Sequence, residues 1–196
     1  MQALPLLALA LCALQLCPAV LGGKGHQRKR MQVGSFSWQN CGGGQDPAVI
    51  RSMSIQPDPI NIPGDITVSI AGATSVTMRS PLAGDVVLEK QLGGGSWIKV
   101  PCVDNIGTCK YDDLCDILDR AIPPGTPCPE PLRSYGIPCH CPFKAGSYAL
   151  PTCSFYIPNL DLPSWLTNGN YRFQVVLSNG GYQIACLKLT LSLQSN

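Results

Sequence analysis

The chain has 196 residues, of which 45% are hydrophobic and 13% charged, and its formal net charge is +2. Four of its fourteen lysines and arginines lie within Lys24–Arg30, so ten basic residues remain against twelve acidic ones from Gly34 onward. That part of the chain has a formal charge of −2, so the basic balance of the whole chain is no argument for nucleic-acid binding, and no such partner is expected.

An apolar run, Leu4–Leu21, opens the chain and is followed by small residues. This pattern is typical of a cleaved secretory signal peptide, with Val20 and Gly22 at the −3 and −1 positions. A membrane anchor is the alternative, but two prolines and a glutamine interrupt the run. The basic run after it is expected to be a solvated or processed tail, and a polyanion-binding patch is the sharper alternative. We expect a signal peptide at 1–22, a basic propeptide or tail at 23–33 and one domain at 34–196.

Most of this domain is predicted to be β-strand. Asp65–Ile70 alternates and is rich in β-branched residues, as half-buried strands are. Flexible Gly93–Ser96 and the Asn-Gly turn within Ser178–Gly181 predict two hairpins. Prolines 57, 59, 63 and 81 indicate edges and bends. The expected strands cover 65–70, 74–78, 85–92, 97–100, 171–177 and 182–193.

One helix is predicted to begin at Asp112-Asp113, because acidic residues suit the N-terminal end of a helix dipole. Apolar residues from Leu114 to Ala121 follow at helical spacing, and Pro123-Pro124 ends the helix. The stretch 123–142 is then so rich in proline and cysteine that we expect irregular structure held by covalent bonds.

Nine cysteines remain after the leader, and in an oxidising compartment such a set predicts a disulfide framework. Spacing alone leaves their pairing open, and the odd number leaves one thiol over. Zinc binding by Cys139-His140-Cys141 is the alternative, but the cluster lacks a repeated CxxC spacing and a second histidine, so no metal is expected.

Enzyme signatures are absent from the sequence: there is no GxSxG, no HExxH and no phosphate-binding glycine loop. A Ser-His-Asp triad would have to use His140, which lies among cysteines and prolines. Cys153 is better explained as a free thiol than as a nucleophile. The acidic pairs Asp112/Asp113 and Asp116/Asp119 fit a solvated helix face. We therefore assign no catalytic residue.

Trp97 and Trp165 both fall in expected loops. A tryptophan in an exposed loop suits a membrane interface, where its apolar ring and its N–H group are both satisfied. The alternative is that each ring covers the core of the domain.

Several strings resemble the ganglioside GM2 activator family of lysosomal sphingolipid activators. They are Ser35-Phe-Ser-Trp-Gln-Asn-Cys41, Asp46-Pro-Ala-Val-Ile-Arg51, the stretch 129–144 with its Cys139-His-Cys-Pro-Phe143, and Leu162-Pro-Ser-Trp-Leu166. The resemblance implies a mainly β fold: a single-domain antiparallel β-cup of about eight strands around a large apolar lipid cavity, with one short helix and four disulfides.

For function, the resemblance implies a non-enzymatic cofactor rather than a catalyst. Such a protein extracts ganglioside GM2 from a membrane and presents it to β-hexosaminidase A, which removes the terminal N-acetylgalactosamine. It acts peripherally at the membrane surface and binds a ganglioside, another glycolipid or a phospholipid instead of a cofactor. The implied lipid- or membrane-contact residues lie on mobile loops at the cavity rim: Trp97, Trp165, Leu162 and Leu166.

The family's disulfide pairing, carried onto this sequence, joins Cys41 to Cys186, Cys102 to Cys109, Cys115 to Cys141 and Cys128 to Cys139. Cys153 is additional to those eight and is expected to be a free thiol.

Two departures from the family pattern concern location and membrane contact. The chain contains no Asn-x-Ser/Thr sequon, and Asp65 stands where the family carries its glycosylated asparagine. We therefore expect the lysosome lumen, secretion, or both. The Trp97 loop is glycine-rich and has fewer aliphatic residues to grip a membrane. A secreted lipid-transfer or protein-binding paralogue without a hexosaminidase role, and a weak esterase or phospholipase, remain alternatives.

Overall fold

A computed structural model of the chain describes residues 36–159 and 166–195. Chain contacts separate Met1–Gln32 from a second unit, Val33–Asn196, and the fold below is that of the second unit. The expected signal peptide and basic tail lie outside the described residues and stay predictions.

The described residues form ten strands and one helix. In chain order these are β1 (Ser37–Asn40), β2 (Ala48–Gln56), β3 (Ile60–Ile62), β4 (Gly64–Thr74), β5 (Leu82–Gln91), β6 (Trp97–Lys99), β7 (Lys110–Tyr111), α1 (Leu114–Ala121), β8 (Gly146–Ile157), β9 (Gly169–Asn179) and β10 (Tyr182–Ser195).

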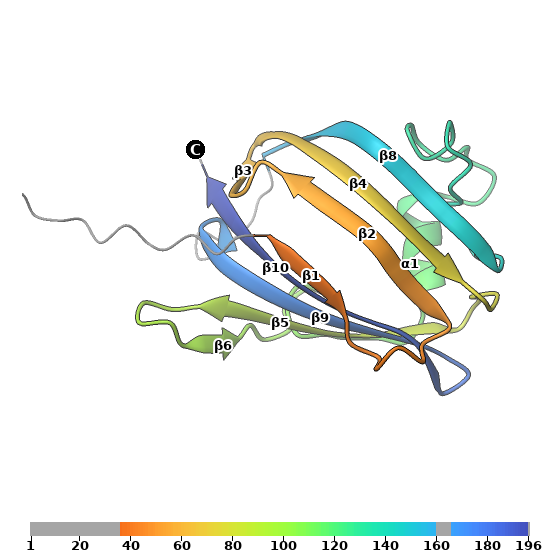
Figure 1. The fold of residues 1–196 in the computed structure, drawn as a ribbon, viewed down its shortest axis with the longest axis horizontal. Helices are drawn as coiled ribbons and strands as arrows, with labels where there is room; N and C mark the ends of the chain where they lie inside the picture. Colours follow the sequence, from red (N-terminus) through yellow and green to blue (C-terminus); the bar gives the residue numbers. More distant parts are fainter. Residues whose placement is uncertain (1–35, 160–165, 196) are drawn as a thin grey trace, which may run out of the picture. The chain divides into compact units, whose positions relative to one another are not determined.

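The strands build two sheets that face each other (Figure 1). Sheet A has the order β1-β10-β9-β5-β6, with β3 added beside β10 and β7 beside β5. Sheet B has the order β2-β4-β8. In Figure 1 sheet B lies above sheet A, and α1 lies near one end of the space between them. The expected mainly β, two-sheeted cup with one helix is therefore confirmed.

Three details differ from the expectation. The described residues contain more than eight strands, and β3 runs parallel to β10. The predicted strand 74–78 is wrong, because β4 ends at Thr74, whose hydroxyl donates to the Val76 carbonyl at 2.8 Å and turns the chain. Five strands were not predicted: β1, β2, β3, β7 and β8. Strand β8 contains Pro151, which its position at the edge of sheet B tolerates.

Helix α1 begins at Leu114, directly after the acidic pair that was predicted to begin it. Asp113 is the N-cap, and its carboxylate accepts from the backbone N–H of Cys115 at 2.9 Å and of Leu82 at 3.0 Å. A Cβ at Gly84 would lie 2.9 Å from Leu114 Cδ1, so α1 rests closely on β5. Within the described ranges, no helix is long and apolar enough to cross a bilayer.

Four disulfides fasten the unit, and they are the four pairs that the resemblance implied. Cys41–Cys186 joins the end of β1 to β10, and Cys102–Cys109 closes the loop before β7. Cys115–Cys141 ties α1 to the following loop, and Cys128–Cys139 closes that loop on itself. Cys153 is free.

Candidate functional site

A cavity of about 360 Å³ lies between the two sheets. Its walls are apolar: Ile50, Ile70 and Leu150 come from sheet B, and Val175, Leu177 and Leu187 come from sheet A. These residues face one another because side chains two apart on a strand share a face. The volume lies within the range of small-molecule sites in proteins.

Every polar side chain that lines this cavity with a hydrogen-bonding group is already bonded. The Asn40 amide donates to the Ile50 carbonyl at 2.7 Å and accepts from the Ile50 N–H at 3.0 Å. The Thr74 hydroxyl donates to Val76, and the Tyr148 hydroxyl donates to the Lys144 carbonyl at 2.6 Å. The cavity therefore offers its ligand hydrocarbon contacts rather than hydrogen bonds, which suits an aliphatic chain.

In the described part of the chain, buried apolar side chains form two packed clusters. One joins Leu88, Val100, Leu166 and Tyr171, and burial raises the pKa of Tyr171 to about 12, so its hydroxyl stays neutral. The other joins Leu82, Cys115 and Ile184 below α1, with partly buried neighbours including Leu177 and Phe143.

Between the clusters, inward-facing residues such as Ile70, Val175 and Leu187 remain only half-buried. Two facing sheets ordinarily interdigitate these side chains to form a filled core. Their partial exposure shows that the sheets do not close on each other here, and the apolar surface they leave is available to a ligand.

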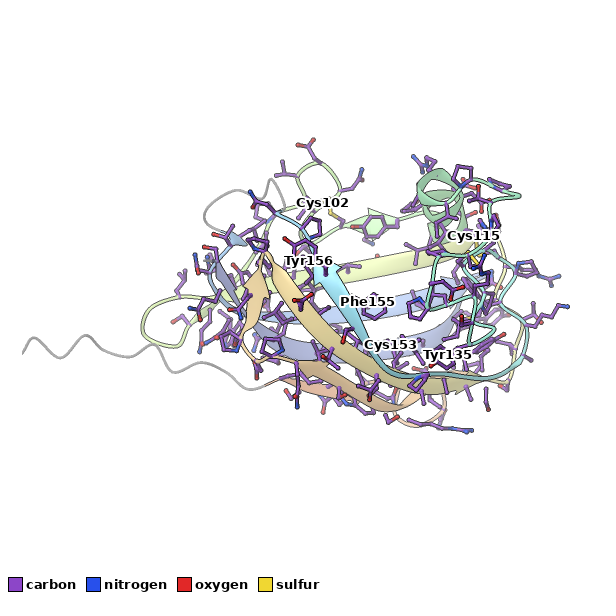
Figure 2. All side chains as sticks on the ribbon, turned by 90° about the horizontal axis from the view of Figure 1, so that it is seen from above. Cys102, Cys115, Tyr135, Cys153, Phe155 and Tyr156 are labelled. Carbon is purple, nitrogen blue, oxygen red and sulfur yellow. A yellow bond between two sulfur atoms is a disulfide. The ribbon has the colours of Figure 1, made fainter. Side chains whose placement is uncertain are left out.

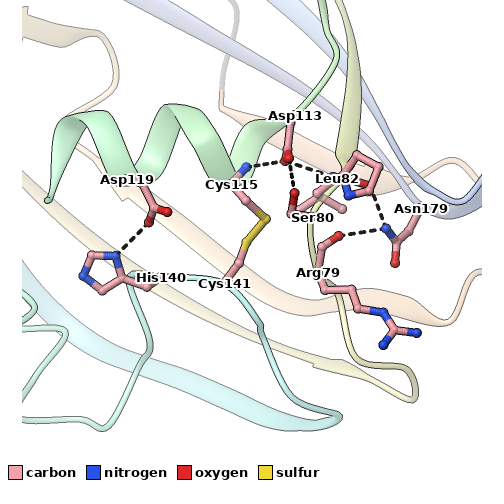
Figure 3. Close-up of a disulfide and its surroundings, with 10 residues drawn as sticks. Arg79, Ser80, Leu82, Asp113, Cys115, Asp119, His140, Cys141 and Asn179 are labelled. Atoms are coloured by element: carbon pink, nitrogen blue, oxygen red, sulfur yellow. Dashed lines mark hydrogen bonds and ion pairs between the residues drawn. A yellow bond between two sulfur atoms is a disulfide. The ribbon is translucent and has the colours of Figure 1, made fainter. Parts of the chain in front are cut away.

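The proline- and cysteine-rich loop supplies part of the cavity wall through Ile137. Its two disulfides hold it against α1 and against itself. In Figure 3, His140 lies beside α1, with its Nδ1 3.2 Å from Asp119, and its Nε2 is 3.4 Å from the Thr126 carbonyl. Both ring nitrogens are thus used in holding the loop in place.

The same loop contains the cluster considered for zinc. Sulfur and nitrogen atoms of Cys128, Cys139 and His140 lie within 4.8 Å of one another. However, the two sulfurs are joined in a disulfide and offer no thiolate to a metal.

The predicted contact residues lie in different surroundings. Trp97 was expected in a loop, but it is the first residue of β6 and pairs with Gln91 of β5. The Arg172 guanidinium lies over its ring at 4.5 Å, on the outer side of sheet A. Leu166 is 6% exposed and belongs to the packed cluster around Tyr171. A membrane contact by Leu166 would require this side chain to leave the core, and the contact stays a prediction. Trp165 and Leu162 lie outside the described residues.

The free thiol has a defined place on β8. Cys153 pairs with Val68 of β4, and a bulge separates this pair from Ile70 and Leu150 further along. Val68 and Ile70 are two apart on one strand, so Cys153 shares the inner face of sheet B with the cavity wall. Figure 2 shows Cys153 and Phe155 along β8.

Sequence reasoning did not single out the cavity walls. The alternation in 65–70, 171–177 and 182–193 predicted their apolar faces, but Ile50 lies on an unpredicted strand. Ile137 lies in an irregular loop, where no periodicity could mark it.

The chain is similar to several known proteins. The model of the ML domain matches residues 35–193. A ganglioside GM2 activator of Macaca fascicularis is 55% identical over 99% of this chain and 97% of its own length. One from Mus musculus is 50% identical over 99% of both chains. Among solved structures, chicken MD-1 complexed with lipid IVa aligns with 81% of this chain and 88% of its own, at 16% identity and a TM-score of 0.34.

Proposed function

Because the chain belongs to the ML-domain family and, within it, to the ganglioside GM2 activators, we propose that it is a non-enzymatic lipid-binding and transfer cofactor. The apolar cavity between the two sheets carries this proposal. Its walls match the hydrocarbon tails of a lipid, and its few polar side chains already make hydrogen bonds within the protein. The lipid is therefore held by its tails, and its headgroup stays outside.

A two-chain lipid buries many methylene groups in a bilayer, each worth about 0.8 kcal/mol, so it does not leave for water unaided. An apolar cavity replaces that environment during transfer. The disulfides help a small unit keep a hollow core, because they limit the conformations of the unfolded chain.

The ligand we propose is ganglioside GM2, and the partner is β-hexosaminidase A. With the tails in the cup, the terminal N-acetylgalactosamine projects into water, where a soluble glycosidase can reach it. The activator contributes no catalytic group to this reaction. His140 is consistent with a non-catalytic protein, since its ring nitrogens face Asp119 of α1 and the Thr126 carbonyl of its own loop.

For location, we propose the lysosome lumen or secretion. The apolar leader and the disulfides support entry into the secretory pathway. The absence of a glycosylation sequon weakens sorting by a glycan and favours secretion.

The test is extraction of GM2 from liposomes by the purified protein, followed by digestion with β-hexosaminidase A. We expect wild-type protein to carry lipid into the soluble fraction and to accelerate release of N-acetylgalactosamine. Ala185→Phe places a ring in the cavity beside Leu177 and should reduce both several-fold.

Ala149→Phe is the matched control, because Ala149 is exposed on the other face of β8. This variant should leave lipid extraction and N-acetylgalactosamine release unchanged. Thermal melting of both variants excludes misfolding as the cause. If wild-type protein extracts no lipid, the carrier function is wrong. If it extracts GM2 but leaves digestion unchanged, the hexosaminidase role is wrong, and lipid transfer alone remains.

A further inference from the structure

A second hollow, of about 560 Å³, lies on the outer face of sheet A, on the side opposite the apolar cavity. Its outward side chains come from two adjacent rows across the sheet. One row runs Glu89–Arg172–Thr190–Ser37, and the next runs Val87–Gln174–Lys188–Gln39. Unlike the cavity between the sheets, this hollow is lined mainly by polar and charged groups.

In the first row, Arg172 is held by two contacts. The Arg172 Nε donates to the Glu89 carboxylate, and the guanidinium lies 4.5 Å from the centre of the Trp97 ring. An arginine fixed on two sides presents its remaining N–H groups in one orientation, at little entropic cost to a ligand.

The second row is polar and unoccupied. Within the described part of the chain, no hydrogen bond or ion pair engages the side chains of Gln174, Lys188 or Gln39. Their three strands are neighbours, so at about 4.8 Å per strand the row spans about 10 Å. It presents an ammonium group between two amides, each of which both donates and accepts.

We propose that this hollow is a binding site for an acidic saccharide. The Lys188 ammonium receives the carboxylate, and the flanking amides of Gln39 and Gln174 bond sugar hydroxyls, while Arg172, held by Glu89 and Trp97, borders the hollow on the β5 side. The span suits two linked sugar rings. A compact inorganic anion would pair with the ammonium group and leave the two amides without hydrogen bonds. The row therefore favours a saccharide, which can bond all three groups.

This site is separate from the lipid cavity, because its side chains point away from the space between the sheets. It therefore does not depend on the proposed carrier function. A protein with both sites holds a lipid by its tails and, independently, an acidic sugar by its rings.

The experiment uses the whole folded chain labelled with ¹⁵N and titrated with 3′-sialyllactose, lactose and inorganic phosphate. We expect shifts of backbone amides confined to β1, β9, β10 and the Trp97 hairpin. Sialyllactose should bind at least about tenfold more tightly than lactose, since the carboxylate adds a charge-assisted hydrogen bond. Phosphate should cause little change.

Two variants sharpen the test. Lys188→Gln should weaken sialyllactose binding about tenfold, and Gln174→Leu should weaken it with the charge unchanged. Lys144→Gln, an exposed lysine in a loop outside this hollow, should bind as wild type. All three should extract lipid normally, which separates this site from the carrier function.

The proposal is overturned if sialyllactose causes no shifts or causes them elsewhere, if lactose or phosphate binds equally well, or if Lys188→Gln and Gln174→Leu both bind as wild type. Should Lys188→Gln fail to fold, the Gln174→Leu result decides.

Discussion

Asp113 connects the start of α1 to the start of β5. Its carboxylate accepts from the Ser80 hydroxyl and from the N–H groups of Leu82 and Cys115 (Figure 3), and these bonds, the first above all, lower its pKa. A group whose pKa is lower in the folded state stabilises the fold above its unfolded pKa, near 3.8, and loses that contribution as the pH falls through the folded value.

We predict that Asp113→Ala lowers the free energy of unfolding by about 1 kcal/mol at pH 7, the usual cost of losing an N-cap. The loss should shrink well below pH 4, where the wild-type carboxyl is protonated too. Urea unfolding at pH 7 and pH 2.5 measures both values. Asp112→Ala, at the exposed neighbouring carboxylate, is the control. An equal loss in the control, or the same loss at both pH values, would contradict this account.

Cys153 reports on whether lipid reaches the inner face of sheet B. It is half-buried and shares that face with Val68 and Ile70. We predict that bound lipid slows the reaction of Cys153 with a maleimide several-fold, because the tails cover the thiol. The rate is measured with and without GM2, and Cys153→Ser should not react. An unchanged rate would mean that the tails stop short of Cys153.

At the level of single residues, some features could be predicted and others could not. The pair Asp112-Asp113, followed by an apolar helical face, indicated that the helix begins there, and Asp113 is its N-cap. The role of Ile137 was hidden, since a wall residue in a proline-rich loop depends on how the disulfides fold that loop back over the sheets. Leu166 lies next to a tryptophan in sequence, yet its own side chain is buried.

The loop 123–142 is the element that most directly shapes the cavity from outside the sheets. We predict that removing the Cys128–Cys139 disulfide with the double substitution Cys128→Ser/Cys139→Ser lowers the free energy of unfolding by about 2–3 kcal/mol. It should also weaken binding of a fluorescent fatty acid, because Ile137 loses its fixed position in the cavity wall. Chemical denaturation and fluorescence titration measure the two effects.

The control is Cys102→Ser/Cys109→Ser, which opens a short loop of similar size that contributes no residue to the cavity wall. It should lower stability comparably and leave fatty-acid affinity unchanged. If both pairs weaken uptake equally, the effect is one of general stability and not of the Ile137 wall.

Strand prediction succeeded where alternation is regular and failed where it is broken. Strands β4, β5, β6, β9 and β10 were predicted within a few residues, apart from the longer β4, because each has one apolar and one polar face. Strand β2 reads AVIRSMSIQ, and its bulge between Ile50 and Ser52 interrupts the period of two. Strand β8 contains a proline and a bulge, so residues two apart in its sequence do not always lie on the same face of the sheet.

For the unit Val33–Asn196, sequence patterns could not predict the apolar cavity between the two sheets. Alternation shows that Ile70 and Val175 face inward, but not whether the two inner faces meet. That depends on the separation of the sheets, which α1 and the Leu82 cluster set on one side and the Tyr171 cluster on the other. The resemblance to a lipid-binding family was needed to expect a cup instead of a filled sandwich.

Net charge gives the last prediction. The chain from Gly34 onward has a formal charge of −2 near neutral pH, with half of its twelve acidic residues between Asp104 and Glu130. Carboxyl groups with pKa values near 4 take up about one proton among twelve between pH 7 and pH 5. Hydrogen bonds from Ser134 and Arg133 lower the pKa of Glu130, so its carboxylate stays charged over this interval.

At a strongly anionic membrane, one elementary charge near the surface is worth about 1 kcal/mol. We therefore predict about fivefold tighter binding to anionic vesicles at pH 5 than at pH 7. Vesicle co-sedimentation at both pH values measures it, with neutral vesicles as the control. The gain should vanish in 0.5 M salt, where the Debye length falls below about 5 Å. Equal binding at both pH values, or a gain that survives salt, would show that apolar contacts alone hold the protein at the membrane.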